Sequence, residues 1–394
     1  MLVENLSVPS DRRVWQESLA LRRAGYDVTV ICPRGEERDR KVFERLEGID
    51  IHRYELRPAR GGAAGYVREY ASACRQTRRL ALRLHRQRSF DVVHASNPPD
   101  LLLPAVWSLK RSGSRFVFDH HDLAPEVYLS RFDRGPDLIY RALRGLEHLT
   151  FRLADVVIST NETYGRLAIE RGGKSESDVF VVRNAPDPDR FRSARSNPAL
   201  KRGREHLLAY VGFIAPQDGV DHALRALAIL RERRDDWHAL FLGSGDALPD
   251  LKRLALELGL DDRVEFAGWA DDALVGEVLA TADVGLAPDP RSPLNDASTM
   301  VKVGEYMSMG VAVVAFDLPE SVVTAEGAAL FAPGNDEAAF AARVEELLGD
   351  PELRARLGAA GRARIAGPLS WSASEAQLLA AYRRALATVR AAPA

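Results

Sequence analysis

The stretch STMVKVGEYMSMGVAVVAF, residues 298–316, carries two charged side chains whose chemistry suits nucleotide binding. Glu305 lies in a helical run that ends at Gly310, and its carboxylate offers two acceptor oxygens to the neighbouring hydroxyls of a ribose. Lys302 adds a positive charge three residues earlier. Backbone N–H groups at a helix start lack helical partners and can hold a phosphate. The predicted helix starts at Ser298, Thr299 and Met300. The other interpretation is that Glu305 and Lys302 form a solvated pair on a surface helix.

A second group of polar side chains ends the predicted strand in FVFDHHDLAPE, residues 116–126. His121 can hydrogen-bond a sugar hydroxyl, and a neighbouring carboxylate, Asp119 or Asp122, can fix its tautomer. His120 alternates to the opposite face of the strand, so we expect it to pack or to support the site. A histidine pair can also bind a metal, but no third and fourth ligand stands at a useful spacing, so no metal site is predicted.

Glycines and an arginine near other predicted element ends are further candidates. Gly243 and Gly245, in GSGD, form either a phosphate loop or a tight turn next to a ligand. Arg13, in NLSVPSDRRVWQE, either reaches a phosphate or an acidic acceptor, or lies in solvent at a helix start capped by Asp11. The DPD at residues 187–189 is typical of an acidic metal-binding pair, but its setting, NAPDPDRF, favours turn chemistry.

Short apolar strands alternate with helices along the chain, which predicts two Rossmann-like halves built on parallel sheets. The domains are predicted at residues 1–190 and 191–369, and residues 370–394 hold a terminal amphipathic helix. Ligands of open parallel sheets bind at the carboxyl ends of the strands. If those ends face each other across a cleft, one half suits a nucleotide donor and the other an acceptor, as in a transferase. The predicted strands lie at residues 26–33, 90–96, 115–121, 154–160, 206–213, 237–245, 263–268, 283–289 and 311–317, and residues 178–191 hold a further strand followed by a proline-rich turn.

The composition bounds the class of protein. The 394 residues are 46% hydrophobic and carry a net charge of −2, so the chain as a whole indicates no nucleic-acid partner. Cys32 and Cys74 are the only cysteines, which predicts a reducing compartment without disulfides. We expect a cytoplasmic protein, because the first residues lack the basic start and apolar core of a signal peptide and no apolar run is long enough to span a membrane.

The order of these motifs resembles that of the retaining, GT-B-fold glycosyltransferases of family four over nearly the whole chain. The matching segments of the second half are AYVGFIAPQDGVDHALRAL, HALFLGSGD, RVEFAGW, ADVGLAPD and STMVKVGEYMSMGVAVVAFDLPES. The first half matches through VVHASNPPDLLLP, FDHHDLAPEVY and VVRNAPD. The resemblance implies a GT-B fold and transfer of a sugar from a nucleotide-sugar, with a UDP-sugar favoured. It also implies retention of anomeric configuration without a metal or other cofactor.

The resemblance assigns roles to residues at matching positions. Glu305 matches the second glutamate of an E-x7-E motif, which binds the donor ribose, and His121, with Asp122 beside it, matches a position that contacts the sugar or its acceptor. The donor site is expected to hold Gly212, Gly243, Gly245, Ser298, Thr299, Met300, Lys302 and Glu305, with Arg13 in addition.

Three positions depart from the family pattern. Ala297 replaces the first glutamate of the motif, and Phe213 and Asp218 replace the arginine and lysine that clamp the diphosphate. Since charge-assisted contacts are the strong ones, another cation must take this role or the donor is held differently. The candidates are Lys302, Arg13 and Arg291. Two rival functions stay open: a related enzyme such as a UDP-sugar 2-epimerase, and a degenerate transferase that serves as a binding or scaffold protein.

An arginine-rich segment precedes residue 90. Residues 53–88 hold ten arginines against Glu55 and Glu69, and residues 66–88 are predicted to form one helix. This helix either contacts anionic lipid or a lipid-phosphate acceptor, or is a solvated face of an arginine-rich chain. The expected partners are therefore a nucleotide-sugar donor and a small-molecule, glycan or lipid-linked acceptor, with peripheral membrane contact as an open alternative.

Overall fold

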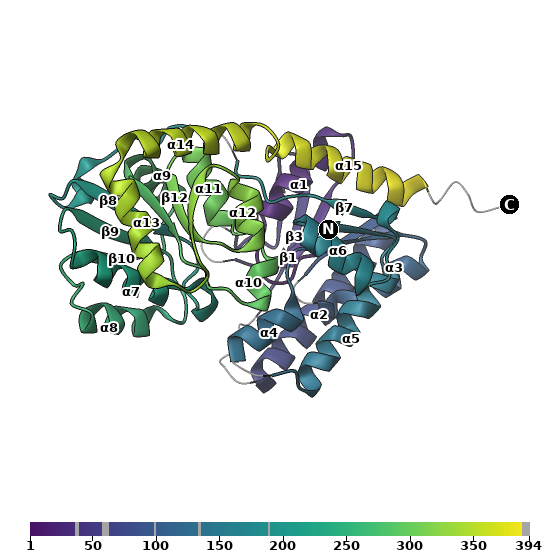
Figure 1. The fold of residues 1–394 in the computed structure, drawn as a ribbon. Helices are drawn as coiled ribbons and strands as arrows, with labels where there is room; N and C mark the ends of the chain where they lie inside the picture. Colours follow the sequence, from purple (N-terminus) through teal and green to yellow (C-terminus); the bar gives the residue numbers. More distant parts are fainter. Residues whose placement is uncertain (36–38, 57–62, 98–99, 133–134, 188–189, 388–394) are drawn as a thin grey trace. The chain divides into compact units, whose positions relative to one another are not determined.

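A computed structural model describes residues 1–35, 39–56, 63–97, 100–132, 135–187 and 190–387. The chain divides into two compact units, each with its own sheet and core (Figure 1). The first unit comprises Met1–Asn184 and Ser372–Ala394, and the second comprises Ala185–Trp371. The last helix therefore belongs to the first unit, although the whole second unit precedes it in the sequence.

The first unit is built on two groups of strands that the start of the chain connects. The parallel group runs in the order β4-β5-β6-β7, and the other runs β1-β3-β2. Leu2 forms parallel bridges to Ile31 of β1 and to Ala95 of β4, so it lies between the two groups. The strands are β1 (Thr29–Pro33), β2 (Phe43–Leu46), β3 (Ile49–Tyr54), β4 (Val92–Ser96), β5 (Arg115–His120), β6 (Val156–Ser159) and β7 (Val179–Val181).

The β2–β3 hairpin was not predicted from the sequence, and its two strands pair antiparallel. The predicted parallel sheets are present in both units, and the hairpin adds one antiparallel strand, β2, at an edge of the first unit. β2, with the sequence FERL, is exposed or half-buried throughout, whereas Ile49 and Ile51 of β3 are fully buried. An edge strand of this kind lacks the continuous apolar run by which buried parallel strands are recognised.

Seven helices of the described residues accompany these strands. The arginine-rich segment is one helix, α2, as predicted. No helix of the described residues is both long enough and apolar enough to cross a bilayer. The helices are α1 (Arg12–Arg23), α2 (Ala63–Gln87), α3 (Leu103–Arg111), α4 (Ala124–Phe132), α5 (Leu138–Leu153), α6 (Glu162–Glu170) and α15 (Trp371–Ala387), with short 3-10 turns η1 (Asp100–Leu102) and η2 (Glu176–Asp178).

The second unit is a parallel six-stranded sheet in the order β10-β9-β8-β11-β12-β13. Its strands are buried on both faces: Leu208 and Tyr210 of β8 belong to one apolar cluster, and Leu207 and Ala209 belong to the other. The strands are β8 (His206–Val211), β9 (Trp237–Leu242), β10 (Val264–Gly268), β11 (Val284–Ala287), β12 (Ala312–Phe316) and β13 (Ala329–Ala332).

Helices cover both faces of this sheet, because its strands carry apolar side chains on both sides. α7 and α13 pack together, and so do α11 and α14. The helices are α7 (Val220–Arg231), α8 (Leu248–Glu257), α9 (Asp272–Thr281), α10 (Pro293–Ala297), α11 (Val301–Met309), α12 (Pro319–Ala325), α13 (Glu337–Gly349) and α14 (Pro351–Ala366), with 3-10 turns η3 (Pro198–Lys201) and η4 (Pro216–Asp218).

Candidate functional site

Glycines bring two loops together at the carboxyl end of the second sheet. A Cβ atom on Gly243, which has φ +152°, would collide with the carbonyl oxygen of Gly212. A Cβ atom on Gly245 would collide with the carbonyl oxygen of Ile214. The Ile214 N–H donates to the Ser244 carbonyl at 3.1 Å, which holds the loops after β8 and β9 in contact. The predicted GSGD motif is therefore a tight turn packed against the loop that follows Gly212.

Helix α11 carries the two charged residues that the sequence singled out. Its N-cap is Met300, whose side chain makes no capping hydrogen bond, and it ends at Gly310 with φ +71°. The Tyr306 hydroxyl accepts a hydrogen bond from the Val211 N–H at 2.9 Å and donates one to the Leu286 carbonyl at 3.0 Å. These bonds fix α11 to β8 and to β11. Ser298 is the C-cap of α10, and its hydroxyl donates to the Leu294 carbonyl in the first turn of that helix.

Lys302 is buried in an ion-pair cluster. Its ammonium group pairs with Asp289 and lies 3.9 Å from Asp218 and 5.3 Å from the centre of the Tyr210 ring. Burial alone would lower the pKa of Lys302, but the two carboxylates raise it. Burial raises the pKa of Asp218 to about 6, although Lys302 opposes the shift. The lysine charge therefore already neutralises acidic side chains of its own unit.

Glu305, one turn further along α11, pairs with Arg190. The Arg190 guanidinium also donates to Asp272 at 3.0 and 3.1 Å and lies 4.3 Å from the centre of the Phe191 ring. Asp272 begins α9, directly after the loop that follows β10. A chain of charges thus joins the start of α9 to the predicted ribose-binding carboxylate. Of the DPD segment at 187–189, residues 188 and 189 lie outside the described residues.

Phe213 and Asp218, which stand where the family pattern has an arginine and a lysine, bring no positive charge to the site, and the candidate cations have acidic partners of their own. Phe213 is 59% exposed, and the Asp218 carboxylate accepts a hydrogen bond from the Ala215 N–H at 3.0 Å. The guanidinium of Arg291 donates to the Asp317 backbone carbonyl at 2.7 Å and to its side chain at 3.2 Å. Ala297 is buried in the short helix α10. The candidate cations Lys302 and Arg291 are therefore both paired with acids of the second unit.

The first unit places its candidate residues in the turn after β5. Asn97 organises this turn: its side-chain oxygen accepts from the N–H groups of His121 and Asp122 at 2.9 and 3.1 Å, and its NH2 donates to the Asp122 carbonyl. The Asp122 carboxylate accepts from the Leu123 N–H at 2.9 Å. His120 is fully buried between aromatic rings, including those of Phe151 and Tyr164, as strand alternation predicts.

Asp119 is the centre of a buried charged network. Arg13 donates to both of its oxygens at 2.7 to 3.2 Å, and the same guanidinium donates to the Val182 carbonyl and to Asn184. His121 Nδ1 lies 3.1 Å from Asp119. Burial would raise the pKa of Asp119, but Arg13 and His121 outweigh it and hold that pKa well below its usual range. Burial would lower the pKa of His121, and Asp119 raises it instead.

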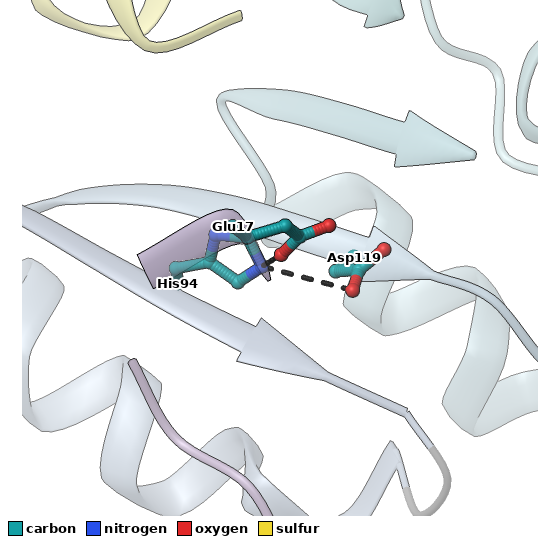
Figure 2. A group of neighbouring side chains, drawn as sticks. All are labelled: Glu17, His94 and Asp119. Atoms are coloured by element: carbon teal, nitrogen blue, oxygen red, sulfur yellow. Dashed lines mark ion pairs between the residues drawn. The ribbon is translucent and has the colours of Figure 1, made fainter. Parts of the chain in front are cut away.

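Two further residues complete this network, as Figure 2 shows. His94 Nε2 lies 3.5 Å from Glu17 and 3.8 Å from Asp119, and all three side chains are buried. Burial and the neighbouring Asp119 raise the pKa of Glu17 well above its usual range. The three residues have the spacing of a metal site. However, the Arg13 guanidinium lies 2.7 Å from Asp119 and 3.2 Å from Glu17, so a cation already neutralises these carboxylates.

The structure thus groups the predicted residues by unit. Gly212, Gly243, Gly245, Ser298 to Met300, Lys302 and Glu305 belong to the second unit, and Arg13, His121 and Asp122 belong to the first. Asp11 caps α1 as predicted, but Arg13 is buried rather than solvated. Sequence reasoning missed Asn97, Glu17, His94, Asp289 and Arg190. The positions of Asn97 and Asp289 at the ends of predicted strands could have indicated these two.

Two family models and curated relatives match this chain. Residues 10–185 match the model described as "Glycosyl transferase 4-like domain", and residues 205–350 match "Glycosyl transferases group 1". The 2-deoxystreptamine glucosyltransferase of Streptomyces kanamyceticus is 30% identical over 254 residues, which cover 61% of this chain and 62% of that protein. The D-inositol 3-phosphate glycosyltransferase of Thermomonospora curvata is 31% identical over 334 residues, which cover 76% of this chain and 75% of that protein.

The chain therefore belongs to the group 1 glycosyltransferases. Solved structures support the GT-B fold. Sucrose-phosphate synthase from Thermosynechococcus elongatus has a TM-score of 0.76 at 18% identity, over 98% of this chain and 99% of that one. Anabaena HepE, solved in complex with UDP-glucose, has a TM-score of 0.67 at 16% identity, over 96% and 97% of the two chains. The protein is thus an enzyme, a GT-B-fold glycosyltransferase, as the motif order predicts.

Proposed function

We propose that the protein transfers a sugar from a UDP-sugar to a hydroxyl acceptor with retention of anomeric configuration. The observation that carries the proposal is the position of Glu305 on α11. The first turn of this helix adjoins Gly212, since the Lys302 side chain lies 3.1 Å from the point a Gly212 Cβ would occupy. Support for a uridine nucleotide comes from HepE, a neighbour of the same fold that was solved with UDP-glucose.

In this proposal the second unit binds the donor. The Glu305 carboxylate accepts hydrogen bonds from the ribose hydroxyls, and in doing so shares or displaces its ion pair with Arg190. The turns at Gly212, Gly243 and Gly245 pack against each other and shape the loop surface that the nucleotide meets in this proposal. The N–H groups in the first turn of α11, which begins at Val301 after the N-cap Met300, face the diphosphate in this proposal, where the positive end of the helix stabilises an anion. The Ser298 N–H already donates to the Asn295 carbonyl at the end of α10.

The first unit binds the acceptor side in this proposal, through His121 and Asp122. Asp119 accepts from His121 Nδ1 and raises the pKa of the imidazole, which favours the imidazolium, and the Nε2–H of that form can donate to a sugar oxygen. Attack from the face that the leaving group departs from gives retention, with a donor phosphate oxygen taking the acceptor proton. The protein then contributes positioning and stabilisation of the leaving diphosphate, with no metal required.

Replacing Glu305 with alanine is expected to weaken UDP binding by roughly 1–3 kcal/mol, since the ribose hydroxyls lose a charged acceptor. Isothermal calorimetry with UDP measures this directly. The matched control is Glu346→Ala, which removes an exposed glutamate paired with Arg343 on α13 of the same unit. If the Glu305 variant and the parent bind UDP with equal affinity, Glu305 does not bind the ribose. If the parent does not bind UDP, the donor is not a UDP-sugar.

Replacing His121 with alanine is expected to lower the rate of transfer by about 10²-fold or more, as for loss of a positioned proton donor. UDP affinity should change little, because His121 belongs to the first unit and Glu305 to the second. Transfer is measured by UDP release after a panel of UDP-sugars has identified the donor. A parallel loss of UDP affinity would assign His121 to the donor pocket instead.

A further inference from the structure

Helix α5 of the first unit presents an apolar face to solvent. Asp137 caps the helix by accepting from the N–H groups of Ile139 and Tyr140. The helix buries Glu147, Thr150 and Phe151 against the unit. On the opposite side Leu138 is 80% exposed and Leu149 is 47% exposed. Exposed leucines are ordinary when scattered singly, but these belong to a continuous row.

The exposed apolar residues of α5 recur every three or four positions from Leu138 to Leu149, so they form one stripe along the helix. Ala142 and Gly145 lie between the two leucines and are exposed, and a Cβ atom on Gly145 would have open space around it. Ile139, 48% exposed, widens the stripe at its start. We call this set the α5 stripe: Leu138, Ile139, Ala142, Gly145 and Leu149.

Basic residues border the α5 stripe along one side. Arg141, His148 and Arg152 are exposed and also recur at helical spacing. Glu147 is the one acidic residue of the helix, and it is buried. The exposed face of α5 is therefore apolar along its centre and positive along one border. This is the pattern of a helix that lies in the interface of a membrane with its apolar side toward the acyl chains.

Neighbouring elements of the same unit also expose apolar and basic side chains. α2 and α5 both contact the short turn η1, whose Leu101 is 37% exposed. α2 exposes arginines along its length and carries no exposed acidic residue among those described. These arginines are Arg68, Arg75, Arg78, Arg79, Arg83 and Arg86. On α3, which packs against α2, Trp107 is 48% exposed.

We propose that the α5 stripe, with its basic border and the arginines of α2, docks the first unit on an anionic lipid bilayer. The occupant of the α5 stripe could be a bilayer or a second copy of the chain, and the charge of the surrounding surface favours the bilayer. Two α5 faces brought together would place basic rows near each other without an exposed carboxylate on either helix to compensate. Anionic lipid headgroups supply the missing negative charge, and the boundary of the acyl region accommodates the apolar side chains. The inference stands apart from the donor assignment.

Vesicle flotation with the full chain tests this inference. We expect the protein to float with vesicles of phosphatidylcholine and phosphatidylglycerol in equal parts and not with vesicles of phosphatidylcholine alone. Binding should weaken as salt rises, because exposed charges are screened. The double variant Leu138→Asp/Leu149→Asp should lower partitioning about tenfold or more, since it removes most of the buried apolar area. The double variant Arg141→Gln/Arg152→Gln should also reduce binding to the anionic vesicles, because it removes two positive charges next to the headgroups.

Helix α8 of the second unit offers matched controls. Leu256 is 64% exposed, and Arg253 on the same helix is also exposed. Leu256→Asp and Arg253→Gln should leave flotation at the parental level. Thermal unfolding checks that every variant is folded. Absence of flotation with anionic vesicles, or equal loss in the α8 and α5 variants, overturns the inference. So does a dimer in light scattering that Leu138→Asp/Leu149→Asp dissociates, because the occupant is then a second copy.

Discussion

Replacing Lys302 with methionine is expected to destabilise the second unit by about 3–5 kcal/mol at neutral pH, the cost of breaking a buried ion pair on one side. The variant leaves the Asp289 carboxylate buried next to Asp218 with no cation. Lys302 opposes the rise in the pKa of Asp218, so without the cation that pKa rises further, and the loss of stability is small near pH 4 and grows toward neutral pH. Urea unfolding over this range of pH measures it.

The double variant Lys302→Met/Asp289→Asn separates stability from binding. It removes both charges of the closest pair and should recover most of the lost stability. In that background, a larger loss of affinity for UDP than for uridine would show that Lys302 also acts on the diphosphate. Equal losses would leave the phosphates to the N–H groups at the start of α11. Parental stability in the single variant would contradict the buried pair itself.

Replacing Asp119 with asparagine is expected to cost the first unit about 3 kcal/mol, because Arg13 keeps its charge in a buried position after losing its closest acid. Asp119 has a depressed pKa in the folded state, so its contribution to stability is present at neutral pH and lost as pH falls toward and below 4. The variant should lack this loss. The pKa of His121 should also fall, which an NMR titration of the histidine detects.

Glu17→Gln is the matched control for Asp119→Asn. Burial and Asp119 raise the pKa of Glu17 well above its usual range, which favours its neutral form, so the amide replaces it with a smaller change in charge than at Asp119. We expect a cost below about 1 kcal/mol, as for other nearly isosteric changes. If Glu17→Gln destabilised the unit as much as Asp119→Asn, the negative charge of the network would reside on Glu17 instead.

The sequence predicted the order and type of most elements because buried parallel strands are continuous apolar runs separated by helices. It placed the strand at 115–121 and the helix that carries Glu305, and the structure has β5 and α11 there. The stop at Gly310 was also predictable, since a left-handed C-cap favours glycine. The β2–β3 hairpin was not, because FERL alternates weakly and one of its faces is open to solvent.

The ion-pair partners of the candidate residues could not be predicted. Arg13 and Asp119 are 106 positions apart, and Arg190 and Glu305 are 115 apart, so no local pattern joins them. The prediction that Lys302 presents a charge to a phosphate treated the side chain as alone, whereas folding places it between two carboxylates. Charge type is visible in a sequence, but the neighbour that compensates it depends on which strands and helices become adjacent.

The contacts of α15 bear on the order in which the chain can fold during translation. Tyr382 shares a 2.9 Å hydrogen bond with His94, and its ring packs edge-on against Tyr26 at 5.4 Å. Arg384 donates to Asp178 near the end of the first segment. A ribosome synthesises all of Ala185–Trp371 before these partners of His94 and Tyr26 emerge. The first unit, although it begins at the first residue, thus reaches its final packing only after the second has been made.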